Sequence, residues 1–570
     1  MRTSSVLEAE ANDMRLRYPV YPRPKCIEAS GGCWLAPGEV RVGVETGPAS
    51  RAARWLAEAV AALNRRPARI VAEGADIRLR LRRRLEGVAD RAEGYALEVC
   101  PEGVALTATS EAGLLHAGRS LLGLLARGEN GRLGAPCCCV RDWPDFPVRG
   151  FLLNAATTFA KMSEVEWQIE LLARNKMNLL HMNFVDAVSF TLPTRRYPKL
   201  NEPPDPRRNG VYSREDIRRM VSLGAARGVD IMPTINVPGH MQYWMRQYPG
   251  LRCEGPRPSP WVMCVGRERG FEMIEGLFDE LLPLFPYPWI HIGTDELEFE
   301  DALERVWLSW RECPHCLRRM RREGLSGVRE LFYYFVRRVH RMLAERGKRL
   351  MMWNDNVDSG RRIDLPRDIR MHFWRTPRPG RGPHAGCSLN RLAAQGFDVV
   401  CSPFNDVYVD SFARDERMMS WTPGRRPPVQ GANLCRILGG IGCSWRGGGK
   451  YPPEYYVPPY LAVLGDRLWN REPVRDAGGF ARGLARHLFG PGTPEALSSL
   501  FQLDGRIVHN ESGRFEETAG VLKPLSEGVR RRLAPEVEAA LRKCAHSGWD
   551  RPTAKAFLDR RREAVNLQRS

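Results

Sequence analysis

Two adjacent carboxylates, Asp295 and Glu296, follow a short apolar run that begins at Trp289. Neighbouring carboxylates raise the free-energy cost of ionising both, so we expect the pKa of one of them to rise. A carboxylic acid that stays protonated near neutral pH can donate a proton to a departing oxygen, as cleavage of a glycosidic bond requires. The alternative is a solvated junction between a strand and a loop, where Asp and Glu are common and do no chemistry.

The elements that must position this pair alternate between buried apolar strands and helices from Val148 onward. The predicted helices include Ser163–Asn175, Ser213–Arg227, Arg269–Leu282 and Val328–Glu345. The predicted strands are Val148–Asn154, Leu179–Val185, Asp230–Asn236, Trp289–Thr294, Arg349–Asn354, Ile369–Trp374, Asp398–Pro403 and Ile437–Trp445. Strands buried on both faces and separated by helices are typical of parallel sheets. Eight of them predict an α/β fold of the (β/α)8 TIM barrel type.

The sequence on either side of these alternating strands and helices has a different pattern. Residues 1–145 mix short strand and helix signals, including a hairpin at Tyr95–Val99 and Gly103–Ala108, and predict an α+β N-terminal domain. The barrel is expected over 146–470. Residues 471–570 are rich in arginine and predict a helical C-terminal extension.

Barrel enzymes place their reactive groups at the C-terminal ends of the strands. In this chain those positions hold an asparagine, several carboxylates, a histidine, a tyrosine and three tryptophans. They are Asn154, Asp186, His240, Asp295, Glu296, Trp353, Trp374, Tyr408, Asp410 and Trp445. Indole faces match the apolar faces of sugar rings and can enclose a group the size of an acetamide. The sequence therefore predicts a carbohydrate site around the paired acids.

An ordered set of motifs resembles the family-20 glycoside hydrolases, the β-N-acetylhexosaminidases. The strand that ends in Gly293-Thr294-Asp295-Glu296 resembles the family's acid motif. The junction from Asp142 to Gly150, Lys176–His181, Pro238–His240, Tyr408–Asp410 and Trp445 follow the family's order. Each motif alone is weak, but the ordered set covers roughly residues 15 to 470 and is specific.

This resemblance implies a substrate-assisted retaining mechanism, in which the substrate's acetamido oxygen attacks the anomeric carbon. Glu296 would be the general acid and then the base, Asp295 would hold the acetamido N–H, and Tyr408 would donate to its oxygen. The substrate-binding residues implied are Arg149 for the sugar hydroxyls, Trp353, Trp374 and Trp445 around the acetamido methyl group, Asp410 for the hydroxymethyl group, and Asp186 with His240 as a polar pair near the acid. The resemblance implies no cofactor and no metal.

Several residues depart from the family pattern. Asn154 and Asn236 stand where acids are usual, and Arg446 and Gly447 replace a stretch that ends in a hydroxyl-binding carboxylate. A hydrolase of altered specificity fits these departures best. A catalytically weak or inactive carbohydrate-binding relative of the same fold is the alternative.

The chain has 570 residues and a formal net charge of +19, which raises the possibility of nucleic-acid binding. Its arginines are scattered and share their segments with Glu or Asp, as solvated helix faces do. We therefore expect an N-acetylhexosamine-containing glycan as the partner, with no nucleic acid and no membrane; the sequence leaves the oligomeric state open. Since no signal-peptide segment is recognisable and the cysteines are too sparse for a disulfide scaffold, the expected location is the cytoplasm.

Two further groups have ordinary interpretations. His181 and His291 lie inside predicted strands and are expected to be core residues. Cys313 and Cys316 form a CxxC pair, but a zinc site needs four ligands and no second pair with suitable spacing is evident. The sequence therefore favours no metal there.

Overall fold

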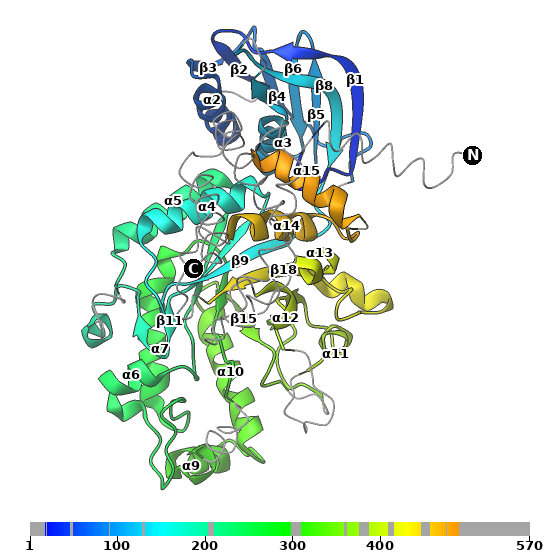
Figure 1. The fold of residues 1–570 in the computed structure, drawn as a ribbon. Helices are drawn as coiled ribbons and strands as arrows, with labels where there is room; N and C mark the ends of the chain where they lie inside the picture. The colour runs from blue at the N-terminus through cyan, green and yellow to red at the C-terminus, as the bar shows by residue number, and fades with distance from the viewer. Residues whose placement is uncertain are drawn as a thin grey trace, which may run out of the picture.

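The structure is a computed structural model that describes residues 18, 20–45, 50–89, 92–127, 131–202, 210–297, 309–357, 362–375, 387–408, 415–445, 457–474 and 476–489. Within them, a sheet-based N-terminal domain sits on a barrel (Figure 1). None of the described helices is long and apolar enough to cross a bilayer.

The N-terminal domain is a mixed sheet with two helices packed on it, which confirms the predicted α+β fold. Its strand order is β1-β8-β5-β6-β4-β2-β3, and β7 pairs with β8. The strands are β1 Cys26–Leu35, β2 Val40–Val44, β3 Ala68–Val71, β4 Ile77–Leu81, β5 Tyr95–Cys100, β6 Gly103–Ala108, β7 Ala126–Arg127 and β8 Leu133–Asp142. The helices are α2 Arg51–Asn64 and α3 Glu111–Leu124, each with a serine N-cap that accepts a backbone hydrogen bond.

Eight parallel strands of the described chain close into a barrel, as the sequence predicts. In their order around the barrel they are β10 Leu179–Asn183, β13 Asp230–Thr234, β14 Trp289–His291, β15 Arg349–Trp353, β16 Arg370–Phe373, β17 Val399–Cys401, β18 Ile437–Ser444 and β9 Val148–Asn154. Short strands β11 Val185–Asp186 and β12 Ser189–Phe190 form a separate ribbon after β10.

Helices connect the strands and cover the outside of the barrel (Figure 1). The longer ones are α4 Met162–Arg174, α5 Arg214–Arg227, α7 Glu268–Leu281, α10 Val328–Ala344 and α14 Val457–Trp469. The shorter ones are η1 Pro198–Asn201, α6 Gln242–Gln247, η2 Pro249–Leu251, η3 Leu282–Leu284, α9 Pro314–Arg322, α11 Leu389–Ala394, α12 Phe404–Val407, α13 Asp415–Ser420 and η4 Gly431–Arg436. Helix α5 begins where its sequence predicts, because Ser213 and Asp216 form a capping box.

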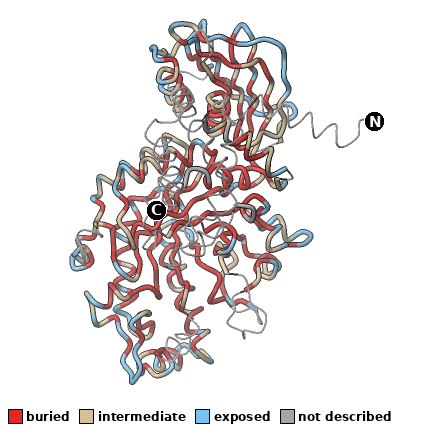
Figure 2. Tube along the Cα trace, in the orientation of Figure 1, coloured by how far each residue is buried: buried red, intermediate tan, exposed pale blue. Residues whose placement is uncertain are grey.

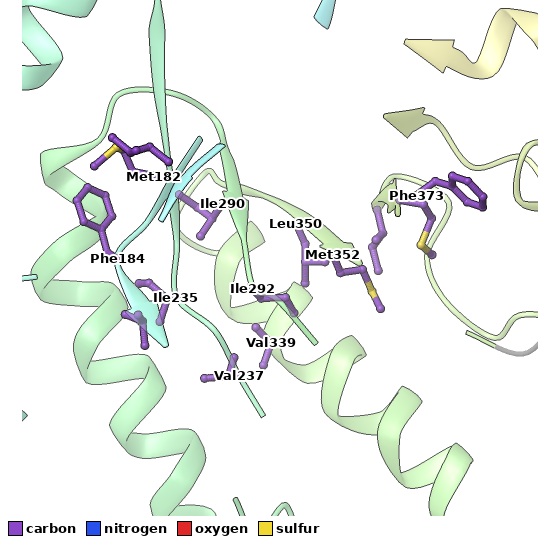
Figure 3. Close-up of a cluster of buried hydrophobic side chains, with 14 of the residues drawn as sticks. Met182, Phe184, Ile235, Val237, Ile290, Ile292, Val339, Leu350, Met352 and Phe373 are labelled. Carbon is purple, nitrogen blue, oxygen red and sulfur yellow. The ribbon is translucent and has the colours of Figure 1, made fainter. Parts of the chain in front are cut away.

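The core lies between the strands and their helices, and Figure 2 shows the barrel strands as almost continuously buried. In the part drawn in Figure 3, Val339 on α10 lies toward Val237 and Ile292 near the ends of two strands. Apolar side chains on both faces of a strand explain why the barrel strands read as unbroken hydrophobic runs.

A buried polar cluster joins the N-terminal domain to the barrel. The Lys176 ammonium donates to Asp142 at 2.9 Å and to the Tyr95 hydroxyl at 2.7 Å. The Trp469 indole N–H donates to the other oxygen of Asp142 at 2.8 Å. Helix α15 Ala477–Phe489 lies beside the same junction, where the Tyr21 hydroxyl donates to the Phe480 carbonyl. Of the predicted C-terminal extension, 490–570 lies outside the described residues.

Candidate active site

The paired acids leave β14 through an unusual backbone. Strand β14 ends at His291, three residues earlier than predicted, and Gly293, Thr294 and Glu296 all have positive φ angles of 67°, 71° and 54°. A Cβ on Gly293 would lie 1.8 Å from the Asn236 amide oxygen, so only glycine fits there. Non-glycine residues in this region store backbone strain, a feature that concentrates at functional sites.

The His240 imidazole lies between three carboxylates. Its Nδ1 donates to Asp186 at 3.0 Å, and its Nε2 lies 3.5 Å from Asp295 and 3.4 Å from Glu296. His240 itself has a φ of 55°. The structure therefore gathers Asp186, His240, Asp295 and Glu296, from the ends of three different strands, into one cluster.

Two amides complete this cluster at positions where the family pattern has acids. The Asn236 amide donates to Asp295 at 3.4 Å, and that of Asn154 donates to Asp186 at 3.4 Å. Asn183 also donates to Asp186, at 3.1 Å. These amides add donors without adding negative charge, which reduces repulsion among the buried carboxylates.

The electrostatics of the cluster separate its acids. Burial raises the pKa of Glu296, and the charges of Asp295 and Asp186 add to this rise, although His240 opposes it. Burial raises the pKa of Asp186, but His240 and the hydrogen bonds from Ala187 and Asn183 together outweigh burial, so that this pKa is lowered. For His240, burial is likewise outweighed by Asp295 and Asp186, and its pKa lies well above its usual value. Glu296 is thus suited to hold a proton while His240 carries positive charge.

Four aromatic rings form a wall at the same end of the barrel. Trp353 lies 6.4 Å from Trp374 and 6.2 Å from Trp445, measured between ring centroids. Tyr408 lies 6.4 Å from Trp374 and 6.1 Å from Trp445, which completes a closed ring of contacts. Burial raises the pKa of Tyr408 well above its usual value, and Cys443, Asp295 and Glu296 add to it, so its hydroxyl remains a donor.

Asp355 joins the aromatic wall to the general-acid candidate, a role that the sequence analysis did not assign. One oxygen of Asp355 accepts the backbone N–H of Glu296 at 2.7 Å, and the other accepts the indole N–H of Trp374 at 3.0 Å. Burial and the neighbouring Asp295 raise the pKa of Asp355 to about 7. Its position at the end of β15 was a signal for it, but only the fold shows which donors it meets.

Three neutral histidines fill the barrel interior below the wall. His181 and His291 are fully buried, as expected of core residues, and His372 lies 3.2 Å from His291. The Trp353 ring stacks on His372 at 3.8 Å. Burial lowers the pKa of all three imidazoles, that of His181 to about 3. They support Trp353 from beneath and carry no charge.

The expected contact of Arg149 with sugar hydroxyls is wrong. Arg149 lies near the start of β9, whereas Asn154 ends that strand at the site. Its guanidinium is fully buried and donates to both oxygens of Glu93 at 2.8 Å and to the Phe146 and Lys176 carbonyls. An arginine near a strand's start belongs to the opposite end of a barrel, and this one holds the N-terminal domain.

Three further residues of the sequence analysis, Asp410, Arg446 and Gly447, lie outside the described residues.

The structure places a second pair of cysteines beside the CxxC pair. Cys253 and Cys264 lie beside Cys313 and Cys316, so the expectation that no second pair accompanies them is wrong. Ten residues separate the new pair, a spacing that gave no recognisable motif.

Comparison with known proteins identifies two family models in this chain. Residues 146–446 match the catalytic domain of glycosyl hydrolase family 20, and residues 17–143 match domain 2 of the same family. These two regions correspond to the barrel and the N-terminal domain.

Individual relatives agree with these matches. A β-hexosaminidase of Porphyromonas gingivalis is 28% identical over 360 residues, which cover 59% of this chain and 44% of that protein. A β-hexosaminidase of Vibrio furnissii is 26% identical, over 70% of this chain and 66% of its own length. The matched regions of the chain thus span 44% and 66% of the lengths of these two relatives.

Among solved structures, the fold is similar to that of a family-20 exo-β-N-acetylglucosaminidase from Vibrio harveyi in complex with N-acetylglucosamine. The TM-score is 0.72 at 24% identity, over 85% of this chain and 78% of that one. Since the catalytic-domain model alone matches more than half of the sequence, the chain belongs to glycosyl hydrolase family 20.

Proposed function

We propose that this protein is an exo-acting β-N-acetylhexosaminidase that removes terminal β-linked N-acetylglucosamine or N-acetylgalactosamine from a glycan. The observation that carries the proposal is the pair of carboxylates of Asp295 and Glu296, which both lie beside His240 at one end of the barrel. Four aromatic rings lie at the same end. The names of the β-hexosaminidase relatives support the same substrate class.

Glu296 is the proposed general acid. As the bond from the anomeric carbon to the departing oxygen breaks, the Glu296 carboxyl gives its proton to that oxygen. The raised pKa of Glu296 supports this role, because the acid must hold its proton near neutral pH. The resulting carboxylate then takes a proton from the water that attacks in the second step.

The proposed nucleophile is the acetamido oxygen of the substrate, which closes an oxazolinium ring on the anomeric carbon. Asp295 would accept the acetamido N–H and stabilise the positive charge that develops on the ring. Tyr408 would donate to the acetamido oxygen, and Trp353, Trp374 and Trp445 would surround the methyl group. The closed arrangement of these four rings supports this assignment.

The test compares three aryl β-glycosides: the N-acetylglucosaminide, the N-acetylgalactosaminide and the glucoside, whose 2-hydroxyl replaces the acetamide. We expect turnover of one or both acetamido sugars and none of the glucoside. A thiazoline mimic of the cyclised intermediate should inhibit this turnover competitively.

Equal turnover of the glucoside would contradict the substrate-assisted step. If folded protein turned over neither acetamido sugar but bound the thiazoline in calorimetry, the carbohydrate-binding alternative would replace the enzyme. The glucoside assay detects the first outcome, and calorimetry with the thiazoline detects the second.

A further inference from the structure

A second cluster of chemically active side chains lies outside the proposed catalytic site. Cys253, Cys264, Cys313 and Cys316 are all buried, and their sulfur atoms lie within 4.8 Å of one another. They come from two loops: Cys253 and Cys264 lie between β13 and α7, and Cys313 and Cys316 lie at the start of α9. In Figure 1, α6 and α9 lie at the end of the barrel away from the N-terminal domain.

The spacing of the sulfur atoms matches a tetrahedral metal site. Cys264 lies 3.7 Å from Cys313 and 3.7 Å from Cys316, and Cys253 lies 4.0 Å from Cys316, measured between Sγ atoms. Four thiolates at the Zn–S length of about 2.3 Å place neighbouring sulfurs about 3.8 Å apart. A disulfide would need about 2.05 Å, which none of these pairs approaches.

The backbone around the cysteines fits the same interpretation. Cys313 is the N-cap of α9, and Pro314 occupies its first turn. Gly266 packs against this turn so closely that a Cβ would lie 2.3 Å from the Cys316 nitrogen. Glycine therefore allows the loop carrying Cys264 to approach the CxxC turn.

The neighbouring side chains indicate which residues would bind a metal ion and which charges lie near them. His315, within the CxxC turn, is paired with Glu254 at 2.9 Å and Arg267 at 2.7 Å and faces those partners. The ligand set is therefore four cysteines. Four thiolates around a divalent ion carry a net charge of −2. The guanidinium groups of Arg267 and buried Arg319 lie against the two cysteine loops, where they also pair with Glu254 and Glu268.

We propose that Cys253, Cys264, Cys313 and Cys316 bind one structural zinc ion. Zinc prefers closed tetrahedral sites of this kind, with all four positions taken by protein thiolates. Such a site supplies folding free energy to the segments that it joins, and residues 253–266 have no helix or strand of their own.

The zinc would hold the loop between β13 and α7 in place. This loop carries His240, the charged neighbour of the proposed acid Glu296. The Trp261 carbonyl accepts the Met241 N–H at 3.1 Å, and the Trp261 ring lies 4.4 Å from the ring of His240. The Trp310 indole N–H donates to the Met263 carbonyl at 3.0 Å and joins this loop to the segment before Cys313. Given the proposed function, the four cysteines are positioning residues for His240.

The first experiment measures metal in the full chain purified without chelators from zinc-supplemented cells. Elemental analysis should find one zinc per chain in the wild type. Cys264→Ser and Cys316→Ser should lose most of it, whereas Cys401→Ala, which alters a buried cysteine outside the cluster, should retain it. Wild-type protein without zinc, or with iron in its place, would overturn the proposal.

The second experiment needs no variant, since the serine substitutions can prevent folding. Titration of the wild type with an organomercurial should release one zinc ion per chain as the thiols react. A zinc-binding dye detects the released zinc. Cobalt-grown protein should show the intense visible absorption of tetrahedral cobalt thiolate. Disulfides among these four cysteines, found by mass spectrometry without reduction, would overturn the proposal.

The positioning role has its own readout. Zinc removal should lower kcat and change the pH dependence of kcat/KM, because His240 loses its fixed place beside Glu296. If zinc-free protein keeps the kcat and the pH dependence of kcat/KM of the zinc-bound protein, the positioning role is overturned. Metal content is measured without substrate, so failure of the zinc site and failure of the proposed function are distinguishable.

Discussion

The carboxylate of Asp355 holds the backbone of Glu296, accepting its N–H at 2.7 Å, and at the same time accepts the Trp374 indole N–H at 3.0 Å. One side chain thereby fixes the distance between the proposed acid and the aromatic wall. This relationship matters because Glu296 has a left-handed φ of 54°, which its own strand does not stabilise.

Asp355→Asn should lower kcat by roughly tenfold to a hundredfold, because an amide can accept only one of the two donors and lost hydrogen bonds to charged groups cost about 1.5–3 kcal/mol. Trp374→Phe is the matched variant, since it removes only the indole donor and keeps an aromatic ring. Steady-state kinetics on the N-acetylglucosaminide would measure both. Unchanged kcat in Asp355→Asn would contradict this positioning role.

Asp355 also predicts a pH dependence of stability. Its pKa is about 7 in the folded protein against an ordinary 3.8, so the fold prefers the protonated form. The contribution of protonated Asp355 to the free energy of unfolding is fully present below about pH 4 and is lost as the pH rises to about 7. Thermal unfolding should therefore show the wild type losing stability relative to Asp355→Asn over this interval. A constant difference in Tm would show that Asp355 does not titrate there.

Glu296→Gln should reduce kcat by about 10²–10⁴-fold, the usual contribution of a general acid. The loss should be larger for substrates with poor leaving groups, which depend most on protonation. Azide should not restore activity, since the proposed nucleophile belongs to the substrate. Glu215→Gln, at an exposed position on α5, is the control.

His240→Gln should move the alkaline limb of the kcat/KM profile to higher pH. The limb reports deprotonation of the acid in the free enzyme, and His240 lowers the pKa of Glu296 by stabilising its ionised form. Removing the imidazolium leaves burial and Asp295 to raise this pKa further. A limb displaced to lower pH would assign the titration to another group.

Arg149→Met should destabilise the protein without impairing catalysis. Removing one partner of a buried ion pair costs about 3–5 kcal/mol, because Glu93 loses its compensating charge. Arg69→Met is the matched control, since its pair with Glu39 is exposed to solvent and contributes little to stability. Chemical denaturation would measure both. A raised KM with unchanged stability would return Arg149 to the substrate site.

The sequence by itself determined the barrel and the residues at its C-terminal rim. An apolar run locates β14 and the capping residues Ser213 and Asp216 locate the start of α5, because burial and capping are local signals that each segment carries. The paired acids and the tryptophans follow from the same rule, since the ends of parallel strands meet at one rim.

Tertiary structure alone decided which groups meet. The resemblance to the family assigned Arg149 to the substrate, yet its position near the start of β9 directs it to Glu93, a partner 56 residues away in the chain. Asp355 gained its role, and Cys253 and Cys264 joined Cys313 and Cys316, through contacts between loops from different strands. Such contacts depend on how the loops fold over the rim, and no local pattern of residues encodes that path.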